Sequence, residues 1–89
     1  MKIKNGFVVE KVGAKYLAVA VGARADDFNA LIRMNSTGAF IWDKLSEADR
    51  RAEEVAALLA SEYEVEESVA MADVASFIDK LRAAGLLDE

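Results

Sequence analysis

The chain has 89 residues, contains no histidine and no cysteine, and has a formal net charge of -5 at pH 7. A chain of this length folds as one small domain with a modest core, so we expect a single domain over residues 1–89 and no deeply enclosed active site. The missing histidine and cysteine exclude thiol nucleophiles, disulfides, zinc sites of the usual ligand types and the commonest general base near neutral pH.

The charge balance and the N-terminus indicate a protein that binds neither nucleic acid nor membrane. Sixteen acidic residues against eleven basic ones repel a polyphosphate backbone and favour a neutral or basic partner surface. No long apolar stretch follows the lysines at the N-terminus, and no window approaches the roughly 18 consecutive apolar residues of a membrane span. We therefore expect a cytoplasmic location.

The first third of the chain has the alternation that is typical of β-strands. Two runs rich in β-branched residues, 7–12 and 16–21, are separated by a short segment that contains Gly13, and they predict a β-hairpin with a glycine turn. A third run, 28–34, alternates between two faces and predicts a third strand. Its more apolar face consists of Phe28, Ala30, Ile32 and Met34.

From residue 35 onward the hydrophobic period is helical. The first helix is predicted over 36–45, because Asn35 or Ser36 can accept hydrogen bonds from the amides of the first turn. Its apolar stripe consists of Gly38, Ile41, Trp42 and Leu45. A glycine on a buried stripe implies the close approach of a neighbouring backbone, and we expect Trp42 to be buried and structural.

Two further helices are predicted over 50–63 and 67–84. The apolar stripe of the helix over 50–63 consists of Val55, Leu58, Leu59 and Tyr63. The stripe of the helix over 67–84 consists of Val74, Phe77, Ile78 and Leu81. Gly85 can adopt the left-handed conformation that ends a helix, and the two leucines after it are expected to fold back onto the core.

Three strands followed by three helices predict an α+β domain with a winged-helix-like architecture, in which a three-stranded antiparallel sheet precedes a three-helix unit. A winged-helix DNA-binding regulator is the alternative function, although acidic residues rather than basic ones begin the helix over 67–84. A small enzyme could use the adjacent carboxylates at 26–27 or 53–54. Such pairs usually serve solubility, and the sequence supplies no obvious cleft that would raise their pKa.

The segment 34–42, MNSTGAFIW, resembles the Leu-Asn-x-Thr-Gly-x-x-Ile-Trp signature of the family of coenzyme PQQ synthesis protein D, the PqqD-like proteins. Two positions depart from the family pattern: Arg51 stands where a small hydroxyl residue is usual, and Glu64 where glycine is usual. The resemblance continues in register through Glu53-Glu54-Val55, Tyr63-Glu64-Val65, Asp73-Val74, Phe77-Ile78, Leu81 and Gly85-Leu86-Leu87.

The resemblance implies a peptide-recognition domain that needs no catalytic residue, cofactor or metal. Members of the family hold the leader segment of a ribosomally made precursor peptide and present it to a modifying enzyme, typically a radical S-adenosylmethionine protein. The leader lies along the third strand as an added strand, in the groove between that strand and the third helix. An exposed strand edge supports such pairing without any catalytic group, because its amides and carbonyls are unpaired.

Transferred to this chain, the resemblance predicts where the peptide binds. The expected peptide-binding residues are Phe28, Asn29, Leu31, Ile32, Arg33, Asp73, Phe77 and Lys80. Leader peptides of the family are commonly acidic, so Arg33 and Lys80 are expected to attract them locally against the net charge. Four questions stay open: the identity of the precursor, whether PQQ is the product, whether the chain forms a homodimer, and which flank of the third helix lines the groove.

Overall fold

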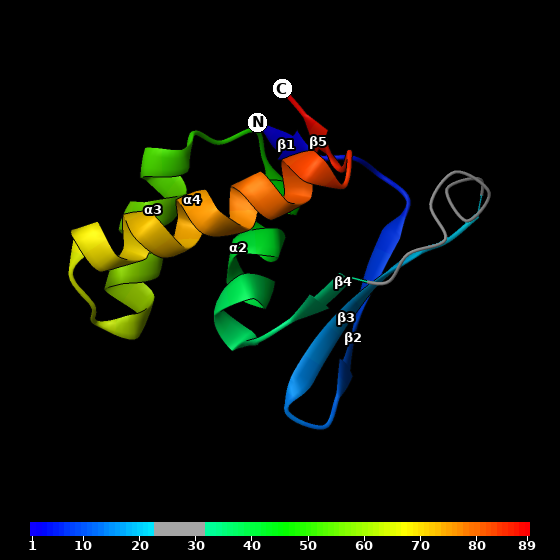
Figure 1. The fold of residues 1–89 in the computed structure, drawn as a ribbon, viewed down its shortest axis with the longest axis horizontal. Coiled ribbons are helices and arrows are strands. Elements are labelled where there is room, and N and C mark those ends of the chain that lie inside the picture. The colour runs from blue at the N-terminus through cyan, green and yellow to red at the C-terminus, as the bar shows by residue number, and fades with distance from the viewer. Residues whose placement is uncertain (23–31) are drawn as a thin grey trace.

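The computed structural model describes residues 1–22 and 32–89, which form a three-stranded antiparallel sheet followed by three helices (Figure 1). This arrangement confirms the predicted α+β class. The β2–β3 hairpin extends away from the helices in Figure 1, and the two ends of the chain lie side by side. In chain order the elements are β1 (Lys2–Ile3), β2 (Phe7–Val12), β3 (Lys15–Ala20), β4 (Ile32–Met34), α2 (Ser36–Glu47), α3 (Ala52–Tyr63), α4 (Glu67–Ala83) and β5 (Leu87–Asp88).

The three-stranded sheet has the order β2-β3-β4. Val12 pairs with Lys15 across the predicted glycine turn, where Gly13 has a positive φ of 63° that an L side chain rarely adopts. Strand β3 therefore begins one residue earlier than predicted. Arg33 of β4 pairs with Leu17 of β3, so the end of the predicted third strand is confirmed, whereas its residues 28–31 lie outside the described residues.

A second sheet, which the sequence analysis did not predict, joins the two ends of the chain. Its strands β1 and β5 are antiparallel, with Ile3 opposite Leu87. Two-residue strands are too short to show a periodic pattern, so the sequence does not predict β1 and β5. Ile3 and Leu86 are both buried in the core, so the expected return of the C-terminal leucines onto the core is confirmed for Leu86.

Helix α2 is the central element of the core, and its predicted stripe is confirmed. Asn35 caps the helix, because its Oδ1 accepts a hydrogen bond from the Gly38 amide at 2.8 Å. The buried residues of the helix are Gly38, Ile41, Trp42 and Leu45. The Trp42 ring also packs edge-to-face on Phe7, with ring centroids 5.8 Å apart, and this contact joins the helix to the sheet.

Helices α3 and α4 pack against each other and against α2 (Figure 1). On α3 the prediction was wrong for two residues, because Leu58 and Tyr63 are 36% and 41% exposed. The buried residues of α3 are instead Val55, Ala56 and Leu59. On α4 the buried residues are Ala70, Val74, Ile78 and Leu81, whereas Phe77 is half-buried at the edge of the stripe.

The two positions that depart from the family pattern, Arg51 and Glu64, lie at the two ends of α3. Arg51 is the N-cap residue, a position where a hydroxyl side chain could accept a hydrogen bond from a first-turn amide. Here the Glu54 carboxylate instead accepts a hydrogen bond from the Arg51 amide at 3.2 Å. Glu64 is the C-cap residue and has the left-handed φ of 53°, a conformation that glycine adopts without strain.

None of the described helices has the length and apolar run that crossing a lipid bilayer requires.

Candidate functional site

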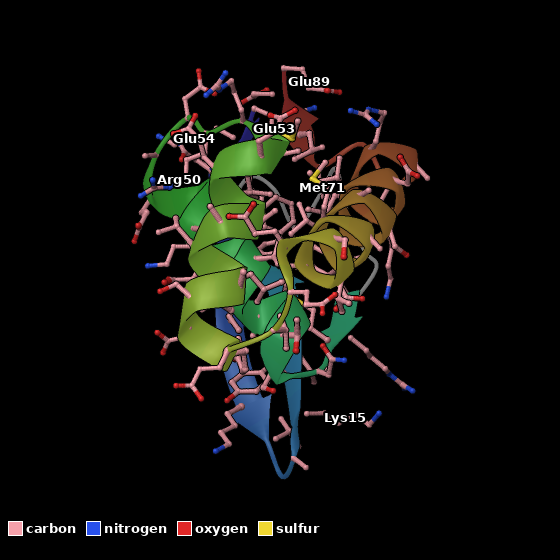
Figure 2. All side chains as sticks on the ribbon, turned by 90° about the vertical axis from the view of Figure 1, so that its left-hand side faces the viewer. Lys15, Arg50, Glu53, Glu54, Met71 and Glu89 are labelled. Atoms are coloured by element: carbon pink, nitrogen blue, oxygen red, sulfur yellow. The ribbon has the colours of Figure 1, made fainter. Side chains whose placement is uncertain are left out.

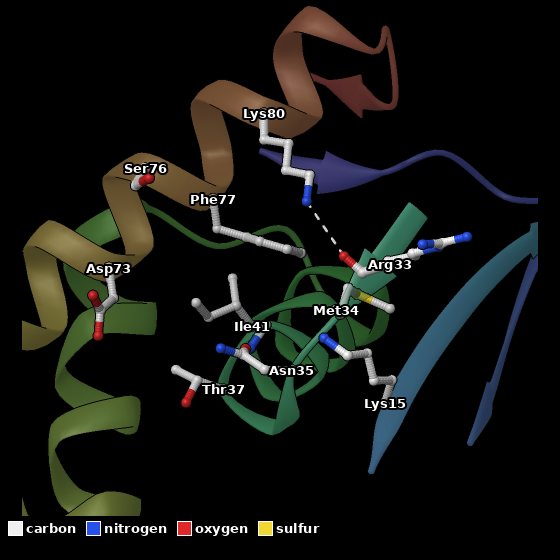
Figure 3. Close-up of a pocket in the computed structure, with 11 residues that line it drawn as sticks. Lys15, Arg33, Met34, Asn35, Thr37, Ile41, Asp73, Ser76, Phe77 and Lys80 are labelled. Carbon is white, nitrogen blue, oxygen red and sulfur yellow. Dashed lines mark hydrogen bonds between the residues drawn. The ribbon is translucent and has the colours of Figure 1, made fainter. Parts of the chain in front are cut away.

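A groove of about 420 Å³ lies between strand β4 and helix α4 (Figure 3). Its apolar lining comes from Met34, Ile41 and Phe77. Its polar walls include Asp73, Ser76 and Lys80 from α4, and Lys15 and Arg33 from the sheet. The groove is therefore an open channel with an apolar floor and charged borders.

Strand β4 forms the sheet-side border of this groove, and among the described residues no strand pairs with its outer edge. The Val21 amide donates to the Gly6 carbonyl at 2.8 Å, which makes these two residues a hydrogen-bonded pair beside strands β2 and β3. Along an antiparallel pair of strands, hydrogen-bonded pairs recur at every second residue. Leu17 lies four residues before Val21, so it also belongs to a hydrogen-bonded pair and its backbone N–H and C=O point toward β2. Arg33, opposite Leu17, consequently directs its N–H and C=O away from β3 and toward the open edge.

Lys80 connects the two sides of the groove. Its Nζ donates a hydrogen bond to the Arg33 carbonyl oxygen at 3.3 Å, although the two residues are 47 positions apart in the chain (Figure 3). This contact agrees with the ladder, because the carbonyl that it uses is the one that faces the open edge. The Arg33 side chain itself extends away from Lys80 in Figure 3.

Gly38 and Phe77 determine the shape of the groove floor. A Cβ atom at Gly38 would lie 3.1 Å from Cε1 of Phe77, which is closer than nine in ten Cβ contacts. The expectation that a backbone approaches this glycine was therefore wrong, since the three nearest atoms belong to the side chains of Phe77, Asn35 and Met34. The missing side chain lets the half-buried ring rest on α2 while its other side lines the groove.

The charges along the groove are unevenly distributed. Three cationic side chains, Lys15, Arg33 and Lys80, line it, whereas its acidic side chain is Asp73. Asp73 lies seven residues before Lys80 on α4, or about 10 Å along the helix axis. The groove is therefore locally basic on a chain whose net charge is -5.

The structure brings four of the predicted site residues together, namely Arg33, Asp73, Phe77 and Lys80. The flank of α4 that lines the groove is thus the one beside Phe77. Ile32 belongs to β4 and packs half-buried against the core. The other three predicted residues, Phe28, Asn29 and Leu31, lie outside the described residues.

Other residues of the groove, among them Lys15 and Ser76, are not among the predicted site residues. Ser76 could have been found, because it lies three residues after Asp73 and four before Lys80 on the same helical flank. Lys15 had no such signal, since it reaches the groove from the far end of the β2–β3 hairpin.

Three carboxylates with lowered pKa values lie near the connection between α2 and α3. A hydrogen bond from Arg50 lowers the pKa of Glu47, and one from the N-terminal ammonium lowers the pKa of Asp49. The backbone amide of Arg51 lowers the pKa of Glu54. Figure 2 shows Glu54 at the opposite end of the molecule from Lys15. These shifts favour the ionised carboxylates, which is the opposite of what a general acid requires.

The described residues also hold no group of three or more histidine, cysteine, aspartate or glutamate side chains placed to bind a metal ion. The groove instead offers an open strand edge, an apolar floor and fixed charges. These features suit the binding of an extended chain.

Comparison with known proteins identifies related sequences and folds. The model of the family coenzyme PQQ synthesis protein D (PqqD) matches residues 24–87, a range that includes Arg33, Asp73, Phe77 and Lys80. The fold is similar to that of TbiB1, solved in complex with the TbiA(beta) leader peptide, with a TM-score of 0.72 and 23% sequence identity. That similarity covers 99% of this chain and 95% of the TbiB1 chain. No curated protein matches the sequence.

Proposed function

Because the chain belongs to the PqqD family, we propose that it binds the leader segment of a ribosomally synthesised precursor peptide and presents it to a modifying enzyme. The observation that carries this proposal is the outer edge of β4, where Arg33 directs its N–H and C=O toward the groove. The presence of a leader peptide in the similarly folded TbiB1 structure supports the same assignment.

In this proposal the leader binds as an additional strand beside β4. Hydrogen bonds between its backbone and that of Arg33 provide affinity for an extended chain whatever its sequence. Alternate side chains of an added strand point to opposite faces, so every second one would face the floor formed by Met34, Ile41 and Phe77. These contacts with the floor and with the charged borders would select the peptide.

The proposed binding surface comprises the described residues Ile32, Arg33, Asp73, Phe77 and Lys80. The predicted residues Phe28, Asn29 and Leu31 extend it along the chain that precedes β4. In this role the protein is a binding partner without catalysis of its own, and its enzyme is a radical S-adenosylmethionine protein of PQQ biosynthesis or of a similar peptide-modifying system.

The alternative of a DNA-binding regulator finds less support. Helix α4 begins with the exposed side chains of Glu67 and, just before it, Glu66, which repel a phosphate backbone.

Isothermal titration calorimetry with synthetic leader segments of precursor peptides encoded beside the gene tests the proposed function. We expect one of these peptides to bind with a micromolar or lower dissociation constant. In a matched NMR titration, the amide of Arg33 and the resonances of Phe77 and Lys80 should shift most. Shifts clustered on the exposed side of α3, around Arg51, would contradict the groove assignment. Absence of binding by every such peptide would contradict the function itself.

A backbone variant tests strand addition directly. Arg33→Pro removes the outward N–H and should weaken peptide binding at least tenfold, because proline cannot donate to an added strand. Arg33→Ala keeps that N–H, so it should lose clearly less affinity. Thermal melting of both variants checks that the sheet remains folded. Equal affinities of the two variants would argue against backbone pairing at this position.

A further inference from the structure

The outward carbonyl of Arg33 is already occupied in the unbound protein. The Lys80 ammonium donates to it at 3.3 Å from the opposite side of the groove. Figure 3 shows the Lys80 side chain descending from α4 across the end of the groove to this carbonyl. A strand added beside β4 needs the same carbonyl and the same space, since paired strands lie about 4.8 Å apart.

We propose that Lys80 determines peptide specificity by holding the open edge of β4 in the unbound protein and releasing it to a peptide that carries a carboxylate beside Arg33. This inference rests on the proposed function, because it concerns the same groove. In this proposal Lys80 weakens the binding of every peptide, because it must be displaced from the strand edge, and it strengthens the binding of acidic peptides, because it then pairs with their carboxylates. Simple attraction between opposite charges would produce only the stronger binding of acidic peptides.

The opposing effect follows from exchange of hydrogen bonds. A peptide amide that pairs with the Arg33 carbonyl replaces the contact from Lys80, so part of the gain from backbone pairing is cancelled. The displaced ammonium returns to water at little cost, because Lys80 is exposed. A neutral peptide therefore binds more weakly than it would to an unoccupied strand edge.

The compensating effect follows from charge. Once displaced, Lys80 remains at the border of the groove, within reach of the side chains of an added strand. A carboxylate there forms a charge-assisted hydrogen bond, which is roughly twice as strong as a neutral one. The Arg33 guanidinium extends away from Lys80 and from the carbonyl that Lys80 contacts, so Lys80 is better placed than Arg33 to make this bond (Figure 3).

The test uses two synthetic peptides and three proteins. The first peptide is an acidic leader segment that binds in the calorimetric screen above, and the second is the same segment with each Asp replaced by Asn and each Glu by Gln. The proteins are the wild type, Lys80→Met and Lys11→Met. Methionine keeps an unbranched apolar side chain but removes the ammonium. Lys11 lies on the β2–β3 hairpin over the Tyr16 ring and does not line the groove, so Lys11→Met controls for the loss of one positive charge.

We expect wild type and Lys11→Met to prefer the acidic peptide by about tenfold, and Lys80→Met to prefer it by no more than about twofold. The decisive measurement is the neutral peptide, which should bind Lys80→Met about threefold more tightly than wild type. If the neutral peptide gains no affinity, Lys80 does not hold the edge and the inference is overturned while peptide binding stands. Absence of binding of either peptide to any of the three proteins would overturn the proposed function, and this inference with it.

Discussion

Helix α4 has two faces that differ in exposure although their residues are interleaved in the sequence. One face is buried, with each of Ala70, Val74, Ile78 and Leu81 at most 4% exposed. The other face lines the groove with Asp73, Ser76, Phe77 and Lys80, which are half-buried or exposed. Because a helix turns once every 3.6 residues, neighbours such as Phe77 and Ile78 belong to different faces.

The two faces of α4 therefore serve different purposes: the buried face contributes to stability, and the groove face is available for recognition. The buried face packs on α3 and α2 and removes apolar surface from water, which is the main favourable contribution to folding. The groove face leaves its polar groups accessible to a ligand. Substitutions on the two faces should therefore have separable effects on the free energy of unfolding and on peptide affinity.

The largest effect is expected for Leu81→Ala on the buried face. Leu81 is fully buried, so its truncation leaves a cavity and should cost about 2–5 kcal/mol of unfolding free energy. That is a large fraction of the roughly 5–15 kcal/mol that stabilises a typical domain. Urea unfolding followed by circular dichroism measures the loss. The control is Ser76→Ala on the groove face, which should change stability by no more than about 0.5 kcal/mol. Similar losses in the two variants would refute the separation of the faces.

Phe77→Ala should affect both properties, because the Phe77 ring lies at the boundary between the faces. Its half-buried ring contributes to the core and to the groove floor, so we expect a cost of about 1–3 kcal/mol in stability. Affinity for the leader segment should fall at least tenfold. Phe77→Leu retains apolar volume and should recover most of the stability and part of the affinity. A Phe77→Ala protein that binds the peptide as wild type does would remove Phe77 from the site.

Glu64→Gly should raise stability without altering either face. Glu64 adopts a left-handed φ of 53° at the end of α3, which costs a residue with a side chain about 1 kcal/mol. Glycine relieves this strain but loses about 0.5–1 kcal/mol more entropy on folding, so the net gain should be no more than about 0.5 kcal/mol. The matched control is Glu62→Gly, inside α3, which should lose about 1 kcal/mol. If Glu62→Gly melts at a higher temperature than Glu64→Gly, the left-handed conformation of Glu64 stores no strain.

Gly38→Ala should change stability little in either direction. Alanine gains up to about 1 kcal/mol in helix propensity, but its Cβ would lie 3.1 Å from the Phe77 ring and 3.3 Å from both Asn35 Oδ1 and Met34 Cβ. The ring borders the open groove and can move into it, and the other two contacts need shifts of a few tenths of an ångström, so stability should stay within about 1 kcal/mol of wild type. The displaced ring should be visible as changed NMR shifts of Phe77, with weaker binding of the leader segment. Unfolding of this variant would indicate that the Phe77 ring is held rigidly and belongs to the buried face.

The local elements of this fold could be predicted because their signals are local. Asn35 at the start of α2 and the spacing of Gly38, Ile41, Trp42 and Leu45 identify one helix and its buried face, since caps and 3.6-residue periodicity depend on neighbouring residues. The same periodicity placed Asp73, Phe77 and Lys80 on one flank of α4. It failed for Leu58 and Tyr63 on α3, where Ala56 is buried in their place.

The tertiary structure alone decided which surfaces meet. The pairing of β1 with β5 joins the two ends of the chain, and no local pattern signals contacts between residues so far apart. The sequence determined that Lys80 flanks the core stripe of α4 and that Arg33 lies near the end of a strand. The order of the sheet turned the Arg33 carbonyl toward the open edge, and the packing of α4 brought Lys80 within 3.3 Å of it. Periodicity specifies the direction of a side chain relative to its own element, whereas the partner it meets depends on how whole elements pack.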